Sequence, residues 1–137
     1  SLDEIIHTVQ APPELLAQPY LEPLYDEPEF IVRNIWRLYG DWYDGNPANL
    51  KPAPDAAVAR ELATLAGGAS RLAARARELV SAGELRLACH MAEYAYLAAP
   101  GDGQLASIRA DVYQARVESE HSLMARAIFQ DAATEKH

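Results

Sequence analysis

The histidine, cysteine and glutamate residues of this sequence are its first candidates for chemistry, because these side chains bind metals and transfer protons. Two pairs have the i,i+3 spacing that places side chains on one helical face, namely His90 with Glu93 and Glu118 with His121. The second pair has the spacing of helical di-iron sites, but such a site needs two pairs and two further glutamates. We therefore interpret these residues as the polar faces of solvated helices, and the sequence assigns no catalytic or metal-binding residue.

Two further patterns have ordinary structural interpretations. The single cysteine, Cys89, adjoins His90, but neighbours on a helix point about 100° apart, so a thiol packed among alanines is favoured over a catalytic dyad. One cysteine permits no internal disulfide. The G-x-G-x-x-A pattern at 101–106 follows an expected helix rather than a strand, so it is interpreted as a helix stop with Asp102 as the next cap, not as a dinucleotide site.

The segment 42–50, with the sequence W-Y-D-G-N-P-A-N-L, carries the one positive signal. It places aromatic rings, an acid, two asparagines and turn residues at the exit of a helix. Asparagine side chains either hold a turn internally or present donors and acceptors to a ligand. Taken alone the pattern favours a structural turn. The residues that could instead face a ligand are Tyr43, Asp44, Asn46 and Asn49.

A long helix beginning at Pro28 must position this segment. Five apolar side chains recur along it at helical spacing and form one stripe: Ile31, Ile35, Leu38, Tyr39 and Trp42. Phe30 and Trp36 lie away from the centre of the stripe, so the helix is apolar on more than one side. Gly45 is expected at the left-handed position past its end. Glu29 with Arg33, and Arg37 with Asp41, form i,i+4 pairs of opposite charge.

The residues before this helix form an arm rich in proline. A short helix is expected over 2–9 and a single turn from Pro13 to Leu16, and residues 18–27 are expected to be irregular but ordered. That irregular stretch is too apolar for a free linker. We therefore expect it to pack on another surface through its tyrosines and leucines, which are Tyr20, Leu21, Leu24 and Tyr25.

The rest of the chain is rich in alanine, leucine and arginine, which favours helices. A helix is expected from Pro54 or Asp55 to a stop at Gly67-Gly68, and further helices over about 69–81, 84–99, 103–116 and 119–133. Their short connections predict antiparallel hairpins. Residues 69–102 match the 34-residue tetratricopeptide pattern, with Pro100 ending the unit and small residues at the close contacts, namely Ala76, Gly83, Ala88 and Ala95. The predicted fold is all-α, with tetratricopeptide-like hairpins and an extended proline-rich N-terminal arm.

Composition and charge exclude several classes of partner. The 137 residues carry a net charge of −8, and residues 1–50 hold nine of the twenty acids with only two arginines. Such a chain repels a phosphate backbone, so no nucleic-acid partner is expected. No membrane partner is expected either, because the sequence has no Lys/Arg cluster and no apolar run near the ~18–20 residues that cross a bilayer. The sequence does not distinguish between compartments.

The run Leu38–Leu50, which contains the Tyr-Asp-Gly-Asn-Pro-Ala-Asn stretch, resembles the signature of the helical dimerisation domain of alkyl sulfatases, a family of metallo-β-lactamase-fold enzymes. The resemblance extends over the whole chain, because 9–15, 67–69, 82–85 and Ala99-Pro100 are similar to other landmarks of that domain. It implies one helical domain over 1–137, with an arm and short helices at 1–27, the long helix and turn at 28–50, and helical pairs at 51–137. It also implies that the chain is a fragment of a larger enzyme.

The resemblance implies a function for that larger enzyme, namely hydrolysis of an alkyl sulfate ester to an alcohol and sulfate. Two zinc ions would be held by a His-x-His-x-Asp-His motif in a metallo-β-lactamase-fold domain of the same chain, and this sequence lacks the motif. The fragment itself would bind no cofactor. Its role would be to form a homodimer beside the active-site cleft. The residues expected to pack in the dimer or against the catalytic domain are Tyr20, Leu24, Tyr25, Phe30, Ile31, Ile35, Trp36 and Trp42.

Two alternatives to this dimerisation module remain open at this point. One is a stand-alone tetratricopeptide-like adaptor that binds a peptide or protein in its groove, which explains only the last two thirds of the chain. The other is a small helical enzyme using Glu118, His121 or Cys89, which is supported by residue identities alone. Under the dimerisation reading, Tyr43, Asp44, Asn46 and Asn49 would form the rim of the larger enzyme's active site.

Overall fold

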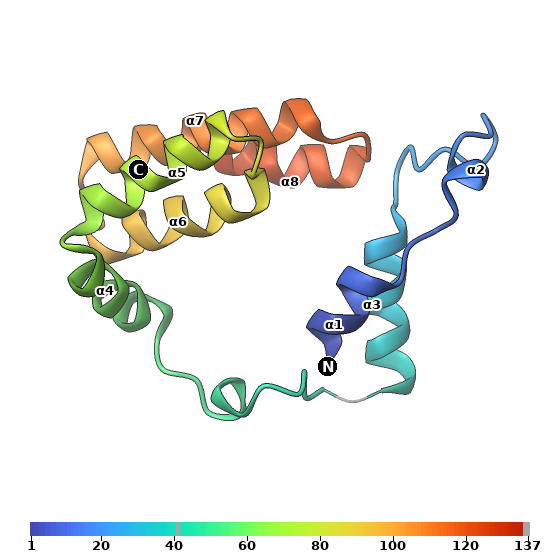
Figure 1. Ribbon diagram of the computed structural model, residues 1–137, viewed down its shortest axis with the longest axis horizontal. Helices are drawn as coiled ribbons and strands as arrows, with labels where there is room; N and C mark the ends of the chain where they lie inside the picture. Colours follow the sequence, from blue (N-terminus) through green and yellow to red (C-terminus); the bar gives the residue numbers. More distant parts are fainter. Residues whose placement is uncertain (41, 136–137) are drawn as a thin grey trace. The chain divides into compact units, whose positions relative to one another are not determined.

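A computed structural model describes residues 1–40 and 42–135. These residues form eight α-helices and one short 3-10 helix, with no strand among them, which confirms the all-α prediction (Figure 1). The chain divides into two compact units. The first contains residues 1–52 and 121–124, and the second contains residues 53–120 and the residues from 125 onward. The boundary at Pro52 lies close to the point after which the sequence becomes rich in alanine, leucine and arginine.

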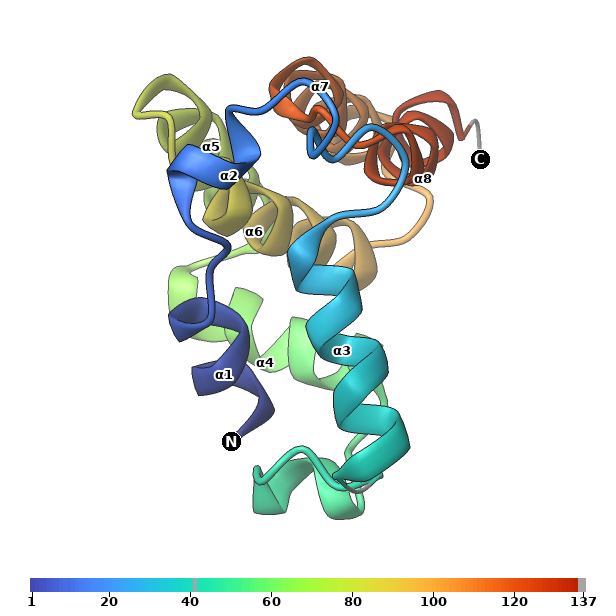
Figure 2. The same cartoon turned by 90° about the vertical axis from the view of Figure 1, so that its right-hand side faces the viewer.

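The first unit is built on two helices, α1 (Leu2–Thr8) and α3 (Pro28–Tyr39), which pack side by side (Figures 1 and 2). Ser1 caps α1 by accepting a hydrogen bond from the Glu4 N–H at 3.2 Å, and Ile6 is buried. The unit also contains α2 (Pro13–Leu16) and the 3-10 helix η1 (Pro47–Leu50). Residues 17–27 form turns and bends without a helix, as the sequence predicts for the arm.

The end of α3 differs from the prediction. The helix stops at Tyr39, so Trp42 does not continue the apolar stripe. Gly40 leaves the helical conformation with ψ −110°, and a Cβ on this residue would lie 2.8 Å from the Trp36 carbonyl oxygen. Gly45 is not the helix cap, since it lies five residues further on, in a turn with φ 91°. Glu29 and Arg33 pair at 3.3 Å, whereas the expected partner of Arg37, Asp41, lies outside the described residues.

The second unit is a set of antiparallel helical hairpins, as predicted. It contains α4 (Asp55–Ala66), α5 (Ala69–Ser81), α6 (Leu85–Ala98), α7 (Gly103–Ser119) and most of α8 (Leu123–Thr134). The most extensive packing joins α5 to α6, α6 to α7 and α4 to α6. Figure 2 views α7 and α8 nearly end on and shows them side by side.

Small residues line the core of the second unit. Ala76, Ala88 and Ala95, which the repeat pattern places at close helix contacts, are each at most 1% exposed. Alanine at these contacts lets helix axes approach closely, and larger side chains from α5 and α7 fill the space between them. Those larger residues are Leu72, Leu79, Leu105, Ile108 and Val112.

The last helices also begin and end differently from the prediction. The sequence predicted helices at 103–116 and 119–133, but α7 continues to Ser119 and α8 begins at Leu123. Polar i,i+4 contacts favour the longer α7, because Gln114 Nε2 donates to Glu118 at 3.1 Å and Arg116 pairs with Glu120. No helix in the described part of the chain is both long and apolar enough to cross a membrane.

Candidate functional site

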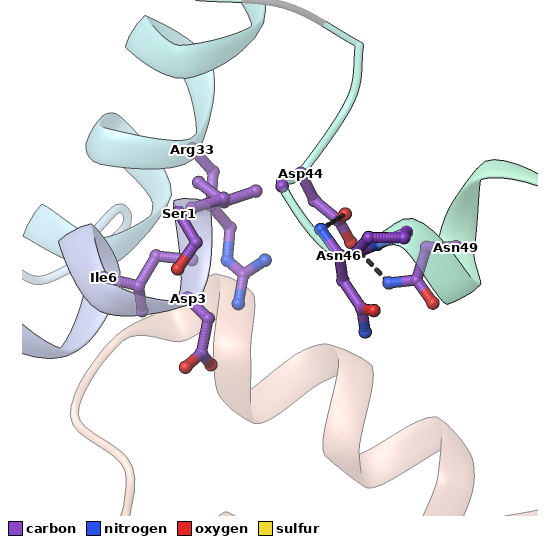
Figure 3. A pocket seen from close by; sticks show the side chains of 10 residues that line it. Ser1, Asp3, Ile6, Arg33, Asp44, Asn46 and Asn49 are labelled. Carbon is purple, nitrogen blue, oxygen red and sulfur yellow. Dashed lines mark hydrogen bonds between the residues drawn. The ribbon is translucent and has the colours of Figure 1, made fainter.

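The segment that follows α3 folds into a turn held by its own polar side chains. One carboxylate oxygen of Asp44 accepts a hydrogen bond from the Asn46 N–H at 2.8 Å, and the other accepts from the side-chain amide of Asn49. Asn46 in turn caps η1, since its side-chain oxygen accepts from the Ala48 N–H at 3.1 Å. Three of the four predicted site residues therefore form one connected cluster (Figure 3).

These hydrogen bonds determine the charge state of the turn. The Asn49 amide, and after it the Asn46 N–H, stabilise the ionised carboxylate and lower the pKa of Asp44 below its ordinary value of 3.8. Asp44 is thus an anion at neutral pH, and both of its carboxylate oxygens accept hydrogen bonds within the turn. A carboxylate in this state accepts hydrogen bonds but is a poor general acid.

A pocket of about 610 Å³ adjoins the turn. Asp44, Asn46 and Asn49 line one side of it, and α1 and α3 supply the other side with Asp3, Ile6 and Arg33 among them. Figure 3 shows the guanidinium of Arg33 reaching into the space between α1 and the turn. The backbone links these walls, because the Leu2 N–H donates to the Asp44 carbonyl at 3.1 Å.

Tyr43 stands apart from this cluster. It is half-buried and does not line the pocket, and its ring lies 6.2 Å from the Trp42 ring at a tilt of 56°. Sequence reasoning missed the contribution of Asp3, Ile6 and Arg33, which lie ten or more residues from the turn along the chain. The packing of α1 against α3 and its contact with the turn bring these residues together, and the sequence carries no local signal for either.

The second candidate surface consists of the exposed apolar side chains of the first unit. Along α3 the side chains of the predicted stripe are exposed, with Ile31 at 49%, Ile35 at 52%, Leu38 at 77% and Tyr39 at 85%. On the arm, Tyr20, Leu24 and Tyr25 are also more than half exposed, as is Trp42 beyond the helix. Phe30 and Trp36, by contrast, are half-buried. Among the described residues, twelve of the seventeen large apolar side chains that are exposed lie within 1–50.

Among the described residues, the histidine, cysteine and glutamate residues that the sequence analysis considered do not assemble a reactive centre. The Glu118–His121 spacing is not helical, because α7 ends at Ser119. Burial raises the pKa of the Cys89 thiol, which disfavours the nucleophilic thiolate. Within residues 1–40 and 42–135, no three His, Cys, Asp or Glu side chains are grouped so that they could hold a metal ion. The described residues therefore do not fit a zinc site.

The most connected polar cluster of that unit surrounds Arg109 on α7. Its Nε donates to Glu93 on α6 at 2.7 Å, and its Nη1 donates to the Ala132 carbonyl and to Glu135, each at 3.2 Å. The guanidinium also lies 5.2 Å and 5.1 Å from the ring centres of Tyr96 and Tyr113. The contacts with Glu93, Tyr96 and Ala132 join α7 to α6 and α8, so the role of the cluster is structural.

Comparison with families of known proteins gives one match over the whole chain. The model of the family described as "Alkyl sulfatase dimerisation" matches residues 1–137. A linear primary-alkylsulfatase of a Pseudomonas species is 34% identical over 94 residues, which cover 68% of this chain. An alkyl/aryl-sulfatase of Saccharomyces cerevisiae is 30% identical over 111 residues, or 81% of the chain. The aligned parts amount to 18% and 17% of these relatives, so the chain spans less than a fifth of their length.

Solved structures with the same fold come from similar proteins. A stereoselective inverting sec-alkylsulfatase from Pseudomonas sp. superposes with a TM-score of 0.86 at 22% identity, covering 100% of this chain and 22% of that one. A double mutant of the sec-alkyl sulfatase PisA1 gives a TM-score of 0.84 at the same identity and covers 98% of this chain. These superpositions show that the fold is shared.

Proposed function

This chain belongs to the alkyl sulfatase dimerisation family, and we propose that it is the segment through which two copies of a larger alkyl sulfatase associate. The observation that carries the proposal is the set of exposed apolar side chains on the first unit. A surface with several large aliphatic and aromatic side chains at half exposure or more is costly in water and marks a site of association. The family's own description, dimerisation, supports a second copy as the occupant.

The dimerisation module explains more of the chain than a tetratricopeptide-like adaptor. The family match covers all 137 residues, whereas the repeat pattern covers only 69–102. An adaptor would use the helical hairpins of the second unit, yet most of the exposed large apolar side chains lie on the arm, on α3 and on the turn. The apolar surface is therefore on the part of the chain that the repeat does not describe.

For the larger protein we propose hydrolysis of alkyl sulfate esters to an alcohol and sulfate. The support is the names of the relatives, which are alkylsulfatases. Two zinc ions would bind in a metallo-β-lactamase-fold domain of that larger protein, as the resemblance to the alkyl sulfatase family implies. The contribution of this chain would be to pair the subunits and to hold a polar turn beside the active site.

Within that assignment, Tyr43, Asp44, Asn46 and Asn49 form the rim of the active site of the larger protein. The pocket beside the turn supports this placement, because Asp44, Asn46 and Asn49 line it together with Arg33. Asp44 would act as a positioning residue, because its hydrogen bonds hold the two asparagines in place. The Tyr43 hydroxyl is the group of this set that the turn itself does not use.

The test of dimerisation is a charge placed on the apolar stripe. Ile35→Glu puts a carboxylate at a position that is 52% exposed in the single chain. We expect sedimentation equilibrium to show self-association of the unchanged chain and a weakening by about two orders of magnitude in the variant, because burying an unpaired charge at an interface is strongly unfavourable. Circular dichroism checks that the variant keeps its helices.

Leu65→Glu provides the matched control. Leu65 on α4 is 83% exposed and lies in the second unit, so the same change of charge and size there should leave self-association within about twofold of the unchanged chain. A chain that stays monomeric at hundreds of micromolar, or equal weakening by both variants, would overturn the assignment of the dimer to this surface.

The rim is tested in the full-length enzyme. Tyr43→Phe removes one hydroxyl and retains the ring beside Trp42. If the hydroxyl contacts the sulfate ester, kcat/KM for an alkyl sulfate falls by about tenfold, the usual scale for one hydrogen bond to a charged group. The subunits stay paired, as gel filtration would show. Unchanged kinetics in Tyr43→Phe and in Asn46→Ala would remove these residues from the active site.

A further inference from the structure

Two backbone carbonyls of the irregular arm are held by residues almost a hundred positions later in the chain. The Leu123 N–H donates to the Leu24 carbonyl at 2.8 Å, and the Met124 N–H donates to the Tyr25 carbonyl at 3.2 Å. The Ser122 hydroxyl also donates to the Tyr25 carbonyl, at 2.8 Å. All five residues belong to the first unit. We name residues 122–124 the anchor.

The anchor supplies hydrogen-bond partners both to the start of α8 and to the arm. Leu123 and Met124 are the first two residues of α8, whose N–H groups have no acceptor within the helix, and the arm carbonyls supply those acceptors. Residues 17–27 of the arm form no helix or strand, so the Leu24 and Tyr25 carbonyls need donors from outside this stretch. Ser122 is 1% exposed, so its hydroxyl makes this bond away from competing water.

The side chains of these two arm residues are exposed to solvent, although their backbone carbonyls are hydrogen-bonded. Leu24 is 59% exposed and Tyr25 is 66% exposed. This combination of a fixed backbone with exposed apolar side chains is what a preorganised binding surface requires, since ordering a loop on binding costs free energy that a preformed loop does not.

We propose that Ser122 is a positioning residue for self-association, which acts by fixing the arm so that the Tyr25 side chain is presented to the second copy. The inference rests on the proposed dimerisation of the chain. It adds a residue that sits outside the apolar surface and contributes no side chain to it. Without the Ser122 hydroxyl, the Tyr25 carbonyl retains one donor of two, and the arm samples conformations that do not fit the partner.

The variant Ser122→Ala tests this in the whole chain 1–137. Sedimentation equilibrium should show a dimer dissociation constant about 3- to 10-fold higher than that of the unchanged chain, the change that corresponds to one net hydrogen bond. Ser119→Ala is the matched control. Its hydroxyl donates to the Arg116 carbonyl at 2.8 Å within α7, so removing it should change the dissociation constant less than twofold.

A second pair of variants separates positioning from general stability. Tyr25→Ala removes the presented side chain but keeps the carbonyl that Ser122 bonds, and it should weaken association by itself. In that background Ser122→Ala should add less than a twofold change, because the side chain it positions is gone. A purely structural serine would instead weaken association by the same factor in both backgrounds.

The outcomes are distinguishable from failure of the dimerisation proposal. If the unchanged chain associates and Ile35→Glu disrupts it, but Ser122→Ala leaves the dissociation constant unchanged, the role of Ser122 is overturned while dimerisation stands. Equal factors for Ser122→Ala with and without Tyr25 overturn it as well. If the unchanged chain is monomeric at hundreds of micromolar, both proposals are overturned together.

Discussion

At the scale of single residues, the turn after α3 illustrates how a polar motif becomes structural. Asp44 accepts hydrogen bonds from the backbone of Asn46 and the side chain of Asn49, while Asn46 caps the 3-10 helix that follows. Each group serves a local need, because Gly45 and Pro47 lie in a turn whose backbone groups need partners. The side chains that remain free to serve a ligand are therefore fewer than the composition of the motif suggests.

The hydrogen bonds to Asp44 predict acid sensitivity of the turn. Because the folded pKa lies below the ordinary value of 3.8, the ionised carboxylate stabilises the turn fully above that value, and the stabilisation is lost as the pH falls through the lowered pKa. A carbon-detected NMR titration from pH 6 to pH 2 should give Asp44 a midpoint below 3.8. Asn49→Ala, which removes the largest cause, should move that midpoint upward.

Asn34→Ala is the control for this titration, because Asn34 is an exposed asparagine in the middle of α3 and away from the turn. Its replacement should leave the Asp44 midpoint in place. A midpoint at or above 3.8 in the unchanged chain, or one that Asn49→Ala does not move, would show that the amide does not hold the carboxylate in solution.

At the scale of elements, one arginine ties three helices of the second unit together. Arg109 on α7 bonds Glu93 on α6, the Ala132 carbonyl on α8 and Glu135 just beyond α8, and it lies between two tyrosine rings. Its side chain is 12% exposed. The planar guanidinium makes these bonds in fixed directions while stacking on both rings, which an ammonium group cannot do.

Arg109→Lys should therefore destabilise the chain although it preserves the charge. We expect a loss of about 1–3 kcal/mol in the free energy of unfolding, from hydrogen bonds and ring contacts that lysine does not replace. Urea unfolding followed by circular dichroism would measure it. Arg75→Lys provides the comparison, since Arg75 pairs with Glu78 at the surface, and its change should stay within about 0.5 kcal/mol. Equal losses in the two variants would contradict the role of Arg109 as a clamp.

The helices were the most predictable part of this fold, for local reasons. The prediction of 69–81 coincides with α5, because Gly67-Gly68 before it and Gly83 after it are strong breaks around a run of helix formers. The prediction failed at the end of the long helix. Leu38 and Tyr39 keep the apolar period inside α3, but Trp42 does not, because the chain turns at Gly40, where a Cβ would lie 2.8 Å from the Trp36 carbonyl oxygen.

Only the part of the candidate site that lies in one continuous stretch of sequence was predictable. Asp44, Asn46 and Asn49 were found because they lie together in one unusual run, and the structure brings them into one cluster. Arg33 and Asp3 were not found, because the pocket they complete depends on α1 packing against α3. The anchor at 122–124 was equally hidden, since a serine between two helices gives no sign that its partner lies 97 residues away.

At the scale of the whole molecule, charge and apolar surface are concentrated in the same part of the sequence. Residues 1–50 carry nine acids against two arginines, and they also carry most of the exposed large apolar side chains. Pairing two copies through this region buries apolar surface, which is favourable, and brings two acidic halves together, which is not. Self-association of this chain should therefore depend on how strongly salt screens the charge.

Raising the salt concentration should strengthen self-association. Charges interact over about 10 Å at 0.1 M ionic strength and about 3 Å at 1 M, so added salt weakens the repulsion between the acidic halves and leaves apolar contacts in place. Sedimentation equilibrium in sodium chloride should show the dimer dissociation constant falling several-fold between about 0.03 M and about 0.5 M. If it rises instead, ion pairs between the copies must dominate the interface, and the apolar stripe of α3 would not be the surface that holds them together.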